Sequence, residues 1–332
     1  MRCGMKMIAA AVCVACAATA NAQQFTMKLS SPTANDVSFE WMKAFKGGVE
    51  TRSAGKIKVE IYPANQLGQI PRTVEGVAMG TIEATLPATG FLIGLEPRFQ
   101  IFDAMGLFDS VAHGMEVVHD ADIRRRLTSF GASKGVEPLT VFIHSPNELA
   151  SRKPVRSLAD LAGQKIRVPG SPLLIEPFKK LGAAPLSMPL GEVLPALQNG
   201  TIDGALAGTT VFTAFKYYDV VKARTRVPSS FIAVGVLTNR KFMTSLGKEL
   251  ERIVREEAAT ADAVVTTWGV EDVERSVKIW EKEGGQNIAL SAADQKKFLD
   301  SASAVTQPIL TSTPQLKEDY EAFLAAAKKY RR

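Results

Sequence analysis

Short apolar segments alternate with amphipathic helical patterns along most of the chain. Five segments have the alternation or the apolar run that predicts a β-strand: residues 25–30, 57–61, 81–86, 136–143 and 165–168. Between the first two of them, Trp41, Phe45 and Val49 recur every four residues, which predicts a helix with one buried face. Strands that alternate with helices in this way predict an α/β fold.

The last part of the chain is predicted to be mostly helical. Residues 241–284 are charged and carry apolar positions at helical spacing as far as Trp280. A helix of this length exceeds what one domain needs, so we expect it to bridge two domains. Residues 290–332 add further helix, which Pro308 and Pro314 interrupt.

Two segments of the chain resemble each other. Residues 75–84 and 192–204 each have a helical pattern, a glycine stop and a short apolar strand, with Gly-Thr-Ile at residues 80–82 and again at 200–202. Any ordinary helix–strand junction has these features, so the pattern alone does not establish a repeat. If it reflects two related domains, the loops at 87–90 and 207–210 should face one cleft, because ligands bind beyond the carboxyl ends of such strands. A length of 332 residues favours two domains over one.

The N-terminus has the pattern of a secretory signal peptide at residues 1–22. Basic Arg2 and Lys6 precede an apolar run at residues 7–18, and Ala20-Asn21-Ala22 is a small-x-small cleavage site. The run is shorter than the roughly 20 residues that a membrane-spanning helix requires. We therefore expect export to the periplasm, with cleavage after Ala22.

All three cysteines lie in this N-terminal segment, at positions 3, 13 and 16. The mature chain would then have no disulfide, thiol nucleophile or cysteine-ligated metal. A lipoprotein signal cleaved before Cys16 is the alternative, but Cys13-Val14-Ala15 lacks the leucine usual at the start of such a site.

The charge balance gives little support to a nucleic-acid partner. The chain has 40 Lys and Arg against 34 Asp and Glu, a net charge of +6 that is spread along the sequence. Hydrophobic residues make up 46% of the chain, as in a folded globular protein.

Two motifs with catalytic or metal-binding potential are weak. Residues 131–135 match the G-x-S-x-G nucleophile elbow, but that motif needs a strand before the serine and a helix after it, and here the order is reversed. His113, Glu116 and His119 share a helical spacing, but a metal site usually needs another ligand and an orienting shell, so a solvated helix face is the better interpretation. We expect no catalytic residues, no metal and no cofactor.

Several strings resemble one family. LADLAGQKIRVPGS at residues 158–171 and LGAAPLSMPLGEVLPALQNGTIDG at 181–204 resemble the solute-binding proteins of tripartite ATP-independent periplasmic (TRAP) transporters, the DctP-like family. SAGKIKVEIYPANQLG at residues 53–68 and FQIFDAMGLFDS at 99–110 are similar to the same family. The resemblance extends over nearly the whole mature chain.

The resemblance implies a type II periplasmic binding protein, with two α/β lobes, a hinge and a long helix bridging both. The lobes would be discontinuous, with residues 23–144 plus 233–272 in lobe I and residues 145–232 plus 273–332 in lobe II. It also implies a small-molecule carboxylate ligand and the membrane subunits of a TRAP transporter as partners. We expect a monomer.

The resemblance assigns the ligand carboxylate to an arginine on the K-I-R-V strand, which is Arg167 here. A planar fork of donors held at a strand end suits that role. The chain departs from many family members at Asn147, where they have arginine, at Ala207, where they have asparagine, and at Leu190, which is often aromatic. Without a second cationic partner, a second ligand carboxylate would cost several kcal/mol to desolvate, so the sequence favours a monocarboxylate with an apolar or aromatic body.

From their loop positions alone, Thr89, Thr209 and Ser31 are further candidates for ligand contacts. Three classes of function stay open at this point. The first is a binding protein that delivers an organic acid to a transporter, with a dicarboxylate binder as a variant. The second is a periplasmic ligand sensor for a receptor. The third is an exported enzyme, which the missing nucleophile–base pair disfavours.

Overall fold

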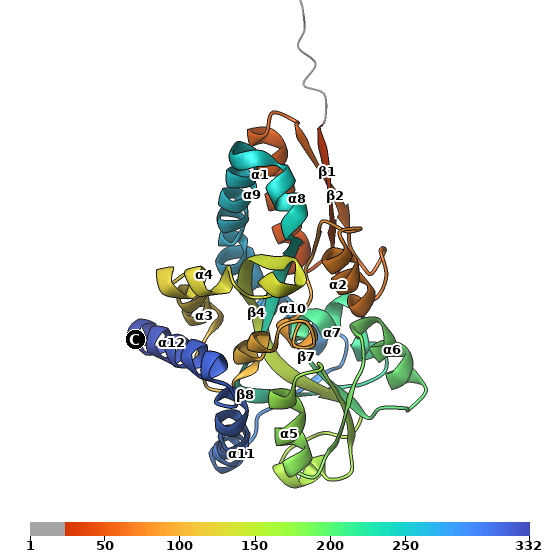
Figure 1. The fold of residues 1–332 in the computed structure, drawn as a ribbon. Helices are drawn as coiled ribbons and strands as arrows, with labels where there is room; N and C mark the ends of the chain where they lie inside the picture. Colours follow the sequence, from red (N-terminus) through yellow and green to blue (C-terminus); the bar gives the residue numbers. More distant parts are fainter. Residues whose placement is uncertain (1–23) are drawn as a thin grey trace, which may run out of the picture.

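The computed structural model describes residues 24–332, and the predicted signal peptide at residues 1–22 lies outside the described residues (Figure 1). The strands are β1 (Phe25–Ser30), β2 (Ile57–Tyr62), β3 (Ala84–Thr85), β4 (Val136–Ser151), β5 (Lys165–Val168), β6 (Ala184–Ser187), β7 (Gly204–Ala207), β8 (Ala223–Asn239) and β9 (Gln286–Ile288). They form one sheet in the order β2-β1-β3-β8-β4-β7-β5-β6, and β9 pairs with β8. The predicted strands at 25–30 and 165–168 are confirmed, whereas the one at 81–86 is reduced to two residues.

Twelve helices surround the sheet in the described part of the chain. They are α1 (Val37–Arg52), α2 (Ile70–Met79), α3 (Val111–Val118), α4 (Ala121–Leu127), α5 (Pro172–Lys180), α6 (Leu190–Gln198), α7 (Thr209–Ala214), α8 (Arg240–Ser245), α9 (Gly247–Ala261), α10 (Val270–Lys282), α11 (Ala292–Leu310) and α12 (Pro314–Tyr330). Within residues 24–332, none of them combines the length and the apolar character needed to cross a membrane.

The two longest strands connect the upper and lower parts of the molecule in Figure 1. β4 and β8 are antiparallel and together pair with β3 at one end and with β7 at the other. The predicted strand at 136–143 therefore continues to Ser151. The register between β4 and β8 shifts between Ile143 and Ser145, and again between Pro146 and Glu148. Such irregularities turn individual side chains out of the regular alternation, here those of His144 and Asn147.

The predicted long helix at 241–284 is divided but still links the two parts. α8 ends at Ser245, and α9 begins at Gly247, whose positive φ of 74° marks the break between the two helices. A π-helical turn at Val265–Gly269 then joins α9 to α10, and such turns bend helices. α9 packs against α1 and α10 packs against α7, so this bent helix contacts both ends of the fold.

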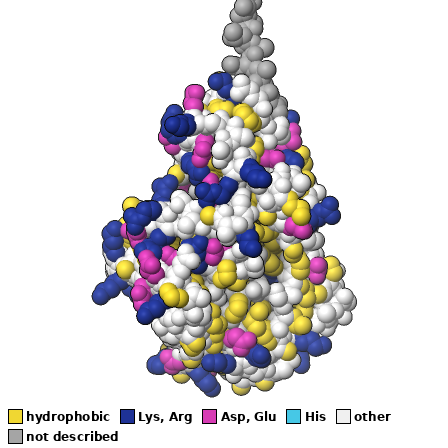
Figure 2. Space-filling view, viewed as in Figure 1, with side chains coloured by type: hydrophobic (Ala, Val, Ile, Leu, Met, Phe, Trp, Pro, Cys, Tyr) yellow, Lys and Arg dark blue, Asp and Glu magenta, His cyan; other side chains and the backbone are white. Residues whose placement is uncertain are grey.

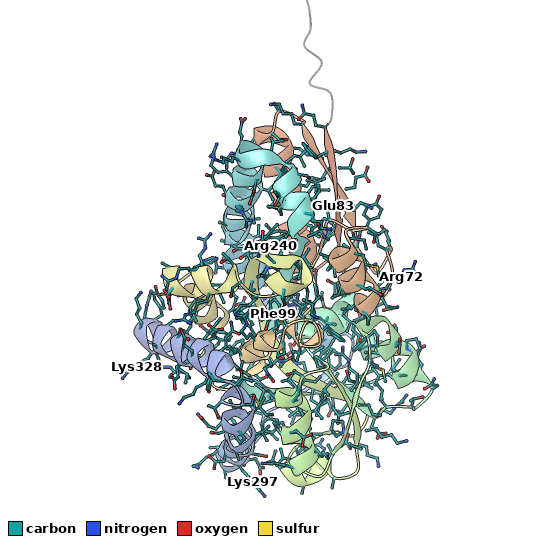
Figure 3. All side chains as sticks on the ribbon, in the orientation of Figure 1. Arg72, Glu83, Phe99, Arg240, Lys297 and Lys328 are labelled. Carbon is teal, nitrogen blue, oxygen red and sulfur yellow. The ribbon has the colours of Figure 1, made fainter. Side chains whose placement is uncertain are left out.

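Aromatic side chains fill the core where the sequence pattern places them. Trp41 and Phe45 on α1 are fully buried and stack with ring centroids 5.0 Å apart. Phe99 lies inside the molecule with its ring edge-on to Phe130, whereas Lys297 and Lys328 extend outward from α11 and α12 (Figure 3). Charged side chains of both signs are interspersed over the face in Figure 2, and hydrophobic side chains gather in its lower half.

Candidate ligand-binding site

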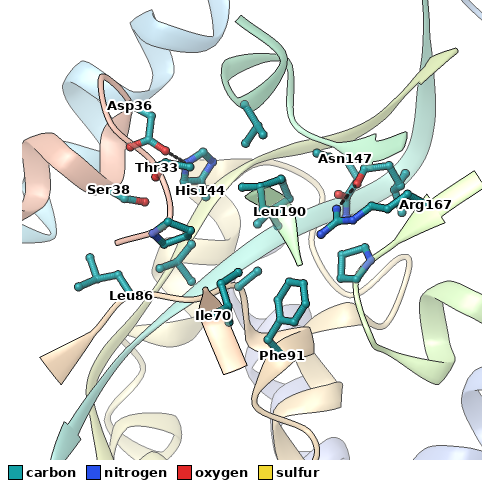
Figure 4. Close-up of a pocket in the computed structure, with 18 residues that line it drawn as sticks. Thr33, Asp36, Ser38, Ile70, Leu86, Phe91, His144, Asn147, Arg167 and Leu190 are labelled. Atoms are coloured by element: carbon teal, nitrogen blue, oxygen red, sulfur yellow. Dashed lines mark hydrogen bonds and ion pairs between the residues drawn. The ribbon is translucent and has the colours of Figure 1, made fainter. Parts of the chain in front are cut away.

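A pocket with about 500 Å³ of empty space, partly open to solvent, lies where several strands end. Its walls come from the segments after β1, β3, β5 and β7 and from the irregular stretch of β4. The lining residues are Pro32, Thr33, Asp36, Ser38, Ile70, Leu86, Ala88, Phe91, His144, Asn147, Arg167, Pro169, Leu190, Leu206, Ala207, Val211, Ile232 and Val234 (Figure 4). From the sequence we expected the loops at 87–90 and 207–210 to face one cleft. Ala88 of the first segment and Ala207 of the second both line this pocket.

Arg167 is the one arginine among these lining residues. On β5 its neighbours Ile166 and Val168 are buried in an apolar cluster with Leu206, so alternation along the strand turns Arg167 to the other face. The guanidinium donates from Nε to the Met188 main-chain oxygen at 3.1 Å and from Nη1 to the Leu206 main-chain oxygen at 3.0 Å. These carbonyls fix its orientation.

The charge of Arg167 has no counter-ion among the described residues. Its side chain is 2% exposed, and none of the ion pairs found within residues 24–332 includes it. Burial lowers the pKa of Arg167 to about 10, still well above neutral pH, so the guanidinium stays charged. A buried charge without a partner costs several kcal/mol, which an anion in the pocket would offset.

Apolar side chains form most of the surface around this cation. Phe91 has its ring centroid 5.7 Å from Cζ of Arg167, within the range of a cation–π contact. Leu190, the first residue of α6, and Ala207, the last of β7, line the same pocket. Walls of this kind exclude water and strengthen any ion pair that forms at Arg167.

Asn147 contributes an amide beside this apolar surface. Its Nδ2 donates to Ser230 Oγ at 3.0 Å, whereas its buried Oδ1 has no hydrogen-bond partner among the described residues. A serine hydroxyl both donates and accepts, so this contact fits either orientation of the amide. In either orientation one end of the amide is left without a partner among the described residues, and a ligand in the pocket can satisfy it.

Asp36 and His144 form a second polar group in the lining. Asp36 begins α1, where its Oδ1 accepts from the Phe39 amide at 3.1 Å, and its Oδ2 lies 3.0 Å from Nε2 of His144. Nδ1 of His144 lies 3.0 Å from Ser145 Oγ. Burial raises the pKa of Asp36, but the bond to His144 and its charge outweigh burial and lower that pKa below its ordinary value.

Asp36, His144 and Ser145 contact one another in turn, as the acid, base and nucleophile of a hydrolase triad do. The serine, however, is not exposed as a nucleophile would have to be. Ser145 is fully buried and is not among the lining residues. Its Oγ lies 2.1 Å from the position that a Cβ on Gly208 would take, so the hydroxyl is packed against backbone. A substrate carbonyl cannot approach it there.

Of the residues predicted from the sequence, Arg167, Asn147, Leu190 and Ala207 line this pocket, and three hydroxyl-bearing residues lie outside its lining. Ser31 Oγ lies 3.1 Å from Thr33 Oγ1, and Thr89 Oγ1 donates to the Ala233 main-chain oxygen at 3.4 Å. Thr209 is hydrogen-bonded to the buried pair of Glu148 and Arg224. Sequence reasoning missed Asp36, His144 and Phe91, because nothing in a single sequence shows that residues so far apart meet.

The histidines of α3 differ from the expectation of a solvated face. His113 is buried, and its Nε2 lies 2.9 Å from the Ala327 main-chain oxygen, because α12 covers α3. His119 is half-exposed, with Nε2 2.8 Å from Asp262 Oδ2. Among the residues that the structure describes, no three His, Cys, Asp or Glu side chains gather as a metal site would require.

Comparison with known proteins gives consistent matches across this chain. A family model described as bacterial extracellular solute-binding protein, family 7, matches residues 30–312. The chain is 27% identical over 275 residues to the 2,3-diketo-L-gulonate-binding periplasmic protein of Escherichia coli K12. This match covers 82% of this chain and 83% of that one. It is also 27% identical over 302 residues to an ectoine/5-hydroxyectoine-binding periplasmic protein of Ruegeria pomeroyi, covering 89% and 88% of the two chains.

The fold is similar to that of solved structures over the same range. A TRAP periplasmic solute-binding protein from Desulfovibrio salexigens with bound orotic acid matches with a TM-score of 0.84 and 26% identity. The match covers 91% of this chain and 99% of that one.

Proposed function

This chain belongs to family 7 of the bacterial extracellular solute-binding proteins, the DctP family of TRAP transporters, and we propose that it captures an organic acid for the membrane subunits of such a transporter. It has the mixed α/β fold of type II periplasmic binding proteins, as the sequence predicts. The chain is a solute-binding protein and not an enzyme.

The observation that carries the proposal is the buried, unpaired charge of Arg167 in the lining of the pocket. Two main-chain carbonyls hold its guanidinium, and a carbonyl orients the group without neutralising it. A ligand carboxylate provides both the missing charge and acceptors for the remaining N–H groups. We therefore assign Arg167 as the anchor of the carboxylate and Asn147, Leu190 and Ala207 as neighbouring contacts.

The relatives support a carboxylate as the ligand class. One binds 2,3-diketo-L-gulonate by its name, and the solved structure from Desulfovibrio salexigens contains orotic acid. Both molecules are organic acids. In this chain the walls of the pocket are mostly apolar, and Arg167 is the one cation of the lining that has no charged partner among the described residues. A second ligand carboxylate would find no such partner there and would cost several kcal/mol to desolvate, so we propose a monocarboxylate with an apolar or aromatic body.

We also propose that the ligand is held between two lobes, with residues 23–144 plus 233–272 in one and residues 145–232 plus 273–332 in the other. The pocket lining supports this division, because Phe91 and Arg167 would then belong to different lobes. The protein would work as a monomer in the periplasm, after the signal peptide has been cleaved off at the bond that follows Ala22. We propose the hydroxyls of Ser31, Thr89 and Thr209 only as weak ligand contacts that change the affinity little, since each has a partner within the protein.

A thermal-shift screen of organic acids tests this function directly. Monocarboxylates with alkyl or aryl bodies should raise the melting temperature, since a ligand at 100 times its Kd adds about 2.7 kcal/mol of stability. The matching alcohols and amides, which lack the carboxylate, serve as controls and should produce no shift. If uncharged analogues stabilise the protein as well as the acids do, carboxylate capture is wrong.

A further inference from the structure

The polar side chains of the pocket gather at two separate places. Figure 4 shows Arg167 and Asn147 on one side and Asp36 and His144 on the other, with Leu190 between them. His144 and Asn147 are three residues apart on β4, and a regular strand rises about 3.3 Å per residue, so at most roughly 10 Å separates these two residues along the strand. Carboxylate binding at Arg167 does not account for the second place.

Asp36 and His144 form a preorganised group. The carboxylate is held by the Phe39 amide at 3.1 Å and by His144 at 3.0 Å, and the imidazole is held from behind by Ser145. Both side chains are more than nine-tenths buried. An ionised carboxylate can accept about four hydrogen bonds, and Asp36 is given them by Phe39, His144 and Thr33, so acceptor capacity for one further donor remains.

The fixed carboxylate also has a defined electrostatic effect. Asp36 lies in the same apolar pocket as Arg167, and the charge of His144 balances that of its carboxylate, so the pair forms a polar end of the pocket opposite the cationic end at Arg167. The pKa of Asp36 is below its ordinary value, which keeps the carboxylate ionised at neutral pH. An ionised acceptor in apolar surroundings favours a donor and disfavours both a methyl group and a second anion.

We propose that the Asp36–His144 pair is a second anchoring point, which binds a hydrogen-bond donor at the end of the ligand remote from its carboxylate. The donor is a hydroxyl or an ammonium group, which the apolar body of the ligand separates from the carboxylate at Arg167. The inference rests on the proposed function, because it assumes that the carboxylate lies at Arg167. It narrows the ligand to an acid that is polar at both ends.

Matched pairs of acids test this assignment by calorimetric titration. ω-Hydroxy acids of four to seven carbons are compared with the alkanoates in which a methyl group replaces the hydroxyl, and with the corresponding ω-amino acids. At the best chain length, the donor-bearing acid should bind about tenfold tighter or more, as expected for a hydrogen bond to a charged group. Tighter binding of the ammonium than of the hydroxyl identifies the charge of Asp36 as the main attraction, and the reverse identifies the hydrogen bond.

The variant Asp36→Asn isolates the carboxylate. Asparagine begins helices as well as aspartate does, so the bond to the Phe39 amide and the fold are retained. Within this variant the preference for the donor-bearing acid over its alkanoate should fall below threefold, whatever change in affinity the two acids share. Asp120→Asn is the matched control, because Asp120 also begins a helix and lies outside the pocket lining.

Two results would overturn the inference. In the first, the wild type binds alkanoates and their donor-bearing partners within threefold of each other, which removes the second anchor but leaves carboxylate capture intact. In the second, the preference survives in Asp36→Asn. If no member of any series binds while Arg167 is intact, carboxylate capture fails, and the second anchor fails with it.

Discussion

The guanidinium of Arg167 on β5 donates from Nη1 to the main-chain oxygen of Leu206 on β7, across 3.0 Å. This bond ties the side chain to the strand beside it, since the two strands pair in parallel through Ile166 and Gly204. The acceptor is a neutral carbonyl, so the bond fixes the direction of the guanidinium and leaves its positive charge uncompensated. The site is thus oriented before any ligand enters.

Asp103 should make the stability of the protein depend on pH. Burial raises its pKa to about 7 from the ordinary 3.8, against a smaller lowering by Ser171. Between these two values the carboxyl of Asp103 is protonated in the folded chain and ionised in the unfolded chain, so its contribution to the free energy of unfolding falls as pH rises from about 4 to 7, by up to about 4 kcal/mol. Urea unfolding at several pH values measures this slope.

Asp103→Asn should flatten that profile, since an amide has no proton to lose in this range. Asp300→Asn, at an ion-paired position on the exposed side of α11, serves as the control and should keep the slope of the wild type. An unchanged slope in Asp103→Asn would show that this carboxyl does not titrate as proposed.

The parts of the fold that follow from local patterns were predictable from the sequence. The strand at 165–168 and the buried face of Trp41 and Phe45 depend on alternation and helical spacing, and both are confirmed. The strand at 81–86 was overestimated, because only Ala84 and Thr85 pair with β1 and β8. Apolar character in that segment reflects burial more than pairing.

Most of the polar lining of the pocket was not predictable. Arg167 could be identified because it lies in a specific string of residues. Asp36 and His144 meet only through the tertiary fold, and His144 faces the pocket because the register of β4 shifts at that point. Periodicity assigns alternate residues to alternate faces and therefore cannot anticipate an irregular strand.

Replacing Thr209 separates a structural role from a ligand contact. Its Oγ1 is bonded to Glu148 and accepts from Arg224 Nη1 at 2.8 Å, within a buried ion pair. Thr209→Val keeps the shape and removes the hydroxyl, so it should lower the free energy of unfolding by about 1–3 kcal/mol. Affinity for the best acid should stay within threefold of the wild type. A tenfold weaker affinity in a variant of unchanged stability would instead make Thr209 a ligand residue.

Ligand preference should follow the polarity of positions 147 and 207. Asn147→Arg with Ala207→Asn introduces a second cation and an amide into the lining of the pocket. Relative to monocarboxylates, this double variant should bind dicarboxylates and sugar acids about tenfold better than the wild type does. The reason is that a charged partner then offsets the desolvation of the extra polar groups. Competition titrations measure the ratio. Tight binding of succinate by the wild type would contradict the reasoning from these two positions.

Binding should also compact the protein. Gly90 lies against Pro169, because a Cβ added to this glycine would be 3.2 Å from Cβ of the proline. The two residues belong to different proposed lobes, so this contact joins the lobes. A ligand that bridges the lobes favours their closed arrangement. Small-angle scattering should therefore give a smaller radius of gyration with saturating ligand than without it. Identical profiles would argue against two lobes that move.

The most direct test of carboxylate capture is calorimetric titration of the best acid into wild type, Arg167→Ala, Arg167→Lys and the control Arg52→Ala, which removes an arginine outside the pocket lining. Truncating one partner of a buried charge pair costs on the order of 2–5 kcal/mol, so Arg167→Ala should bind about 30-fold to several thousand-fold more weakly. Arg167→Lys should recover only part of this loss, since an ammonium lacks the planar fork. Arg52→Ala should bind like the wild type. A folded Arg167→Ala protein that binds within threefold of the wild type would contradict the assignment of Arg167.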